Sequence, residues 1–116
     1  MTDKPGDRLR LMHILEAIRE IQEYTLGTDV KTFTGNSMMY NASLRQLEII
    51  GEAANHLSME IHLDFPEVPW ARIIGLRNLV IHEYFGVDDL SIWSVIQYNL
   101  PDLKEKIEHI IRFRFS

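Results

Sequence analysis

The chain has 116 residues, of which 46% are hydrophobic and 25% charged, and this composition excludes disordered and fibrous proteins. The length fits one domain that buries a single core, so we expect one domain over residues 1–116. The absence of cysteine excludes disulfides and thiolate metal sites, and a formal net charge of -5 argues against broad, non-specific binding of nucleic acid, although a local basic site remains open.

The first expected element is an amphipathic helix that starts at Asp7 and runs to about Leu26. Its buried face is predicted from apolar residues that recur at helical spacing, namely Leu11, Ile14, Leu15, Ile18 and Ile21. Gly27 follows where a helix of this kind would end. Residues 28–36 are then expected to form a polar connection.

A long second helix is predicted next, with Asn36 or Ser37 as its cap and with Ile61 near its end. Its apolar stripe consists of Tyr40, Leu44, Leu47, Gly51, Ala54, Leu57 and Ile61. A thin segment, at which another helix could approach closely, is made by Gly51, Ala53 and Ala54.

Two prolines in the stretch DFPEVPW interrupt the helical pattern, and a third helix is expected to begin near Pro69 and to end at Gly86. Asp88 or Asp89 can cap a short fourth helix, and Pro101 suits the first turn of a fifth.

No window alternates with a period of two, so the sequence predicts an all-α protein, and the short loops predict an antiparallel bundle of about five helices. The sequence has no uninterrupted run of about 18 apolar residues, which is the length needed to span a bilayer, and no signal peptide is apparent. We therefore expect a cytoplasmic protein without a membrane partner.

The run RNLVIHEYF, from Arg77 to Phe85, places five polar side chains in an apolar stretch, among them an arginine, an asparagine, a histidine and a tyrosine, and each needs a partner once it is buried. On an ideal helix Arg77 and His82 lie roughly 140° apart, so they do not share a face. Convergence would require the arginine to swing round, the helix to loosen near Gly86, or a second subunit to supply the partner group. The third option is the most economical, because a two-fold interface along this helix would bring two copies of each side chain together.

An arginine and a histidine together suit the cleavage of RNA without a metal ion. A histidine that titrates near neutrality can accept the proton of the ribose 2′-hydroxyl or donate one to the leaving oxygen. An arginine can hold the phosphate and stabilise its charge. The spacing alone leaves a structural alternative open, in which Arg77 pairs with Glu48 or Glu52, His82 favours a helix C-terminus and Tyr84 is a core ring.

Other candidates are weaker. Glu48 and Glu52 lie one helical turn apart and could orient Arg77, or they could simply form a solvated helix face. The remaining histidines are His13, His56, His62 and His109. Their positions do not show the spacing of metal ligands, so we expect no metal site. No glycine-rich phosphate loop is present, so we expect no cofactor and no ATP bound by this chain itself.

The run LRNLVIHEYFGVD, preceded by IGEAANHLS and PEVPWARIIG and followed by IWSVIQYNLPDL, resembles the HepT-like branch of the HEPN superfamily. Arg77 with Asn78, then His82 after four intervening residues, then Tyr84 two residues later match that family's motif. The similarity covers nearly the whole chain.

The resemblance implies a HEPN-like homodimer that acts as the toxin of a toxin–antitoxin system. Arg77 and His82 of both subunits would line a shared cleft that cleaves RNA such as tRNA or mRNA, with Asn78 in support. The partner would be a minimal nucleotidyltransferase of the MntA type, which transfers AMP from ATP to Tyr84. The added bulk and negative charge would then block the cleft and repel RNA.

Two further hypotheses remain open. The chain could be a non-catalytic HEPN module that docks a nucleotidyltransferase or binds a nucleotide. It could also be a helical bundle with an interaction role and no toxicity.

Overall fold

The computed structural model describes residues 6–78 and 89–115, and within these ranges the chain is built from helices alone. The elements are α1 (Asp7–Thr25), α2 (Val30–Gly35), α3 (Ser37–Asn55), α4 (Met59–Asp64), α5 (Trp70–Ile74), the 3₁₀ turn η1 (Gly75–Asn78), α7 (Asp89–Ser94), the π-helical turn η3 (Val95–Asn99) and α8 (Leu100–Phe115). The all-α prediction is confirmed.

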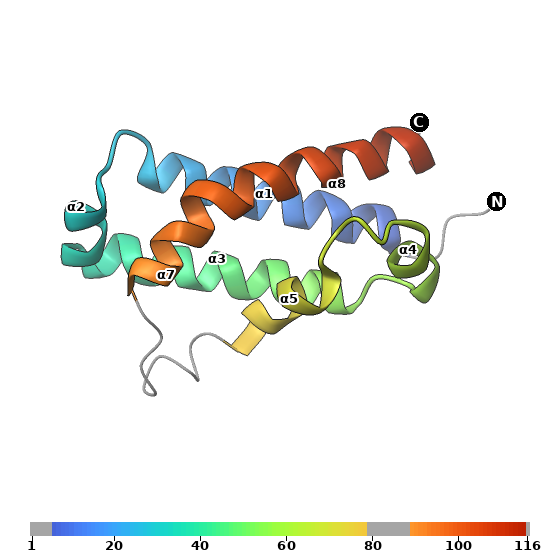
Figure 1. Ribbon diagram of the computed structural model, residues 1–116, viewed down its shortest axis with the longest axis horizontal. Helices are drawn as coiled ribbons and strands as arrows, with labels where there is room; N and C mark the ends of the chain where they lie inside the picture. Colours follow the sequence, from blue (N-terminus) through green and yellow to red (C-terminus); the bar gives the residue numbers. More distant parts are fainter. Residues whose placement is uncertain (1–5, 79–88, 116) are drawn as a thin grey trace.

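Three long helices form the bundle. Figure 1 shows α1 running antiparallel to both α3 and α8, and the shorter helices lie at the ends and along one side. Apolar side chains from the three long helices fill the core, and the fully buried ones include Leu11, Ile14, Ile18, Ile21, Leu44, Leu47, Ile50, Ile107 and Ile110. The antiparallel helical bundle that the sequence predicts is therefore the observed architecture.

The first predicted helix matches α1 closely. All five residues of its predicted apolar face are buried. The chain leaves the helix through Leu26 and reaches Gly27, whose φ of 72° lies in the left-handed region that glycine tolerates.

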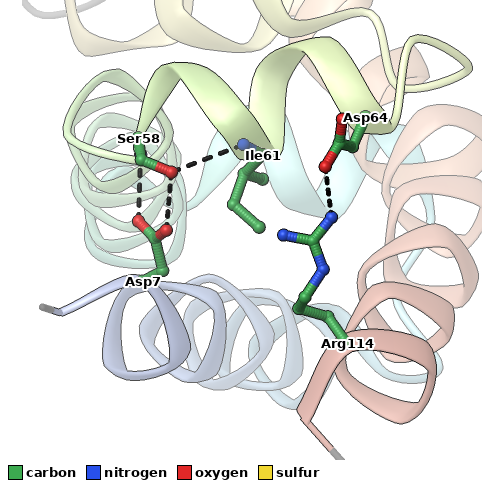
Figure 2. A network of polar contacts seen from close by, with 5 residues as sticks. All are labelled: Asp7, Ser58, Ile61, Asp64 and Arg114. Atoms are coloured by element: carbon green, nitrogen blue, oxygen red, sulfur yellow. Dashed lines mark hydrogen bonds and ion pairs between the residues drawn. The ribbon is translucent and has the colours of Figure 1, made fainter. Parts of the chain in front are cut away.

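The N-terminal end of α1 is tied to α4 by a buried carboxylate (Figure 2). Asp7 is only 2% exposed, and its two oxygens accept hydrogen bonds from the backbone N–H of Ser58 at 2.9 Å and from the Ser58 hydroxyl at 2.6 Å. The same hydroxyl accepts a bond from the backbone N–H of Ile61 and so caps α4.

Replacing Asp7 by alanine should lower the free energy of unfolding by about 1.5–3 kcal/mol, because the donors of Ser58 would lose a charged acceptor in a site shielded from water. Urea denaturation of the purified protein measures this. Asp102→Ala is the matched control, since Asp102 makes an exposed ion pair with Lys106 on α8, and its removal should cost less than about 1 kcal/mol. Equal losses in the two variants would contradict the prediction.

The polar connection predicted for residues 28–36 is wrong, because most of it forms α2. Asp29 caps this helix by accepting a hydrogen bond from the backbone N–H of Thr32 at 2.8 Å. Hydrogen bonds from the backbone and the hydroxyl of Thr32 lower the pKa of Asp29. Phe33 is fully buried against the rings of Tyr40 and Trp93, and it is the one buried side chain of this helix.

The predicted second helix begins as expected but ends early. Asn36 caps α3 by accepting a hydrogen bond from the backbone N–H of Met39 at 3.0 Å. The helix stops at Asn55, and α4 begins only at Met59. The apolar stripe continues through this break because Leu57 and Ile61 are both buried, which is why the periodicity predicted a longer helix.

The third predicted helix starts at Trp70, directly after Pro69, as expected. It is short, because α5 ends at Ile74 and tightens into η1 over the next four residues. The predicted continuation to Gly86 lies outside the described residues.

The fourth and fifth predicted helices form one unbroken helical run from Asp89 to Phe115, which Figure 1 shows as a continuous ribbon. Pro101 lies in the first turn of α8, as predicted, but it does not separate two helices. It has no N–H to donate to the carbonyl of Gln97, and its ring crowds that carbonyl. The chain widens into the π turn η3 at this point and continues. None of the described helices is both long and apolar enough to cross a bilayer.

Candidate functional site

Arg77 lies in η1, the turn that follows α5, and its side chain is exposed. Both α5 and η1 pack against α3. The backbones come close together at Gly51 of α3, where an added Cβ would lie 3.0 Å from the carbonyl oxygen of Ile73, 3.1 Å from the Cα of Arg77 and closer still to the Arg77 backbone nitrogen. The backbone of η1 therefore rests directly on α3, at a point where no side chain fits.

The thin segment predicted in the second helix is thus real, and Gly51 forms its contact surface. Ala54 is fully buried in the core, and Ala53 packs against the core from a half-buried position. The close approach is made by the end of helix α5, at Ile73, and by the 3₁₀ turn η1, at Arg77.

Glu48 and Glu52 do not hold Arg77 in an ion pair among the residues that the structure describes. Glu48 is half-buried, and the Glu52 carboxylate lies 3.2 Å from the Nδ1 atom of His56. The same Nδ1 is 2.9 Å from the backbone carbonyl of Glu52. The salt bridge that the structural alternative requires is therefore absent within that range, and the Arg77 side chain is exposed.

Asn78 closes η1 and is half-buried, while His82 and Tyr84 lie outside the described residues. Convergence of Arg77 and His82, and modification of Tyr84, therefore stay predictions. The roles of Asn78, Glu48 and Glu52 also stay predictions.

Sequence reasoning missed a contact beyond the other end of the motif. The hydroxyl of Tyr40 on α3 donates a hydrogen bond to the Oδ1 atom of Asp89, the first residue of α7, at 2.8 Å. Tyr40 is 8% exposed. A buried tyrosine hydroxyl normally needs a hydrogen-bond partner, and this need is the feature of the sequence that could have indicated the contact. On either side of residues 79–88, the chain thus contacts α3 through Arg77, at Gly51, and through Asp89, at Tyr40.

A pocket of about 550 Å³ opens beside η1, between α5 on one side and the α7–η3–α8 run on the other. Its wall is apolar at Ile73, Leu76, Val95, Leu100 and Leu103. Polar groups come from Arg72, Ser91, Asn99 and Asp102. Arg72 thus adds a second cationic group on the same short stretch of chain as Arg77.

The last turn of α8 is also basic, with Arg112 and Arg114, but neither residue lines this pocket. Arg114 at the end of α8 pairs with Asp64 of α4, and its guanidinium lies 5.3 Å from the centroid of the Phe65 ring (Figure 2 shows the ion pair). Its charge is therefore largely used within the fold, and the local positive charge near η1 comes from Arg72 and Arg77.

The chain matches the model of the family described as "Ribonuclease HepT-like" over residues 14–110. It is 39% identical over 98 residues to a protein of Methanocaldococcus jannaschii named "Putative RNase MJ1380", which covers 84% of this chain and 90% of the relative. It is 36% identical over 100 residues to the "Probable ribonuclease HepT" of Thermococcus cleftensis, over 86% of this chain and 91% of the relative. No solved structure matches the chain significantly.

Proposed function

Because the chain belongs to the HepT-like family of the HEPN superfamily, we propose that it is an endoribonuclease that cleaves RNA without a metal ion. Arg77 and His82 are its catalytic residues, and Asn78 supports them. The observation that carries the proposal is the exposed side chain of Arg77. It belongs to a turn whose backbone packs directly against α3, and it has no ion-pair partner among the described residues.

In the proposed reaction, His82 removes the proton of a ribose 2′-hydroxyl, and the 2′-oxygen attacks the adjacent phosphorus. The bond from phosphorus to the 5′-oxygen breaks, and a second histidine protonates that oxygen as it leaves. Arg77 stabilises the negative charge that builds on the phosphate oxygens in between. The products are a 2′,3′-cyclic phosphate and a free 5′-hydroxyl.

The reaction needs a proton acceptor and a proton donor at the same time, and one motif offers a single histidine. A homodimer supplies two copies of His82 and two of Arg77 to one cleft at the interface. The dimer is therefore part of the proposed mechanism.

The biological role proposed here is that of the toxin in a toxin–antitoxin pair that acts on tRNA or mRNA. A nucleotidyltransferase of the MntA type is the proposed antitoxin, and it transfers AMP to Tyr84. An adenylate at this position places negative charge two residues from His82, where the RNA phosphate would bind. Family membership and the match of the motif support this role.

The test is cleavage of total cellular RNA by the purified, unmodified protein in the presence of EDTA, with its intact mass checked for added AMP. We expect cleavage that EDTA does not slow, and fragments that end in a 2′,3′-cyclic phosphate. Cleavage that stops on chelation would contradict the metal-free mechanism. An unmodified protein that leaves all RNA intact would favour the alternative, a non-catalytic module that docks a nucleotidyltransferase or binds a nucleotide.

A further inference from the structure

We propose that Gly51 is a positioning residue for Arg77. Because Gly51 has no side chain, the backbone of η1 can pack directly against α3, and this contact sets the position of the turn that carries Arg77. The proposal rests on the proposed function, since it concerns the arginine that would hold the RNA phosphate. It assigns a role in the reaction to a buried glycine that touches no substrate.

The conformation of Gly51 does not require a glycine. Only Gly6 and Gly27 have a positive φ among the described residues, whereas Gly51 lies within α3, where alanine would stabilise the helix better. The reason for glycine is therefore the space around it. An added Cβ would meet the carbonyl oxygen of Ile73 at 3.0 Å and the Cα of Arg77 at 3.1 Å, with the Arg77 nitrogen nearer than either.

The three atoms nearest to a Cβ at position 51 all belong to the backbone, so this contact cannot be relieved by moving a flexible side chain. Ile73 is 6% exposed and is anchored in the core by its own side chain. The side chains of η1 are less buried, because Arg77 is exposed and Leu76 is only half-buried. A Cβ at position 51 should consequently displace η1 more than α5.

The position of the Arg77 guanidinium depends on this contact between the backbones of η1 and α3. No ion pair to another described residue holds the side chain in place, so a shift of the η1 backbone passes directly to the charged group. A group that stabilises a transition state loses much of its effect when it is misplaced by about 1 Å.

The experiment compares two glycine-to-alanine variants. Gly51→Ala places a Cβ against η1, whereas Gly75→Ala makes the same change in η1 itself, two residues from Arg77, where a Cβ would meet nothing within 4 Å. We expect Gly51→Ala to lower kcat for RNA cleavage about 10- to 100-fold, with a smaller change in KM and with circular dichroism unchanged. Gly75→Ala should stay within about twofold of the unsubstituted protein, because its φ of -59° already suits alanine.

A double-mutant cycle separates positioning from general loosening of the fold. In the Arg77→Ala background, Gly51→Ala should cause no further loss of kcat, since the group that it positions is gone. Equal losses in both backgrounds, or a Gly51→Ala variant with unchanged kcat, would overturn the positioning role while leaving the ribonuclease intact. No cleavage by the unsubstituted protein would instead overturn the proposed function and this proposal together.

Leu76→Ala provides a second route if Gly51→Ala does not fold. Leu76 is half-buried against the core and lies next to Arg77, so its truncation loosens the same turn without adding an atom beneath it. Its loss of kcat should also vanish in the Arg77→Ala background. A loss of the same size in both backgrounds would overturn the proposal.

Discussion

Replacing Arg77 by alanine is expected to lower kcat for RNA cleavage by about 10²- to 10³-fold, the loss typical of removing one donor that stabilises charge in a transition state. The fold should not change, because the side chain is exposed and makes no ion pair with another described residue. Arg77→Lys should recover only part of the rate, since an ammonium keeps the charge but cannot bind the phosphate bidentately. Single-turnover cleavage of a defined RNA measures the three rates.

Arg19→Ala is the matched control for Arg77→Ala. Arg19 is an exposed arginine on α1, and its replacement removes one positive charge, as Arg77→Ala does. Loss of rate in both variants to the same degree would mean that general charge, and not the position of Arg77, governs cleavage. A rate that stays unchanged in Arg77→Ala would remove this residue from the mechanism.

The parts of the fold that the sequence predicts well are those whose cause is local. The stripe from Leu11 to Ile21 determines α1, and Asn36 caps α3, because both depend on neighbours within one helical turn. The all-α class follows from the same local patterns.

The errors arise where the periodicity of apolar residues does not report the path of the backbone. The helix α2 has one buried side chain, Phe33, and its partner Trp93 comes 60 residues later, so periodicity could not detect it. The break between α3 and α4 is hidden because Leu57 and Ile61 remain buried on either side of it. Pro101 predicts the start of a separate helix, yet a π turn just before it keeps the helical run continuous.

The candidate site follows the same division. Residue types and spacing in one short stretch are enough to nominate Arg77, and its role in cleavage stays a prediction. For Gly51, the sequence predicts only that another segment can approach the helix closely at this point. Which segment does so depends on the packing of the whole fold, and it is the stretch from Ile73 to Arg77. The bond between Tyr40 and Asp89 joins residues 49 positions apart and has no local signature beyond a tyrosine hydroxyl that needs a partner.

Replacing His82 by alanine is expected to have the largest effect on cleavage, a loss of kcat of about 10²- to 10⁴-fold, because both copies of the group proposed to move protons disappear from the dimer. The rate of the unsubstituted protein should show a bell-shaped dependence on pH, since the acceptor must be neutral while the donor must carry its proton. Histidine ordinarily titrates at about 6.5, so the maximum should lie near neutrality. The residual activity of His82→Ala should have lost that bell shape.

His13→Ala is the matched control, because His13 is an exposed histidine on α1. It should keep both the rate and the bell-shaped profile. Comparing pH profiles is more informative than comparing rates alone, since a variant that merely folds poorly loses amplitude at every pH, whereas loss of the proton-transfer group changes the shape. A His82→Ala variant that keeps the full rate and the same profile would exclude histidine catalysis. The function of the chain would then lie in binding a partner at the motif.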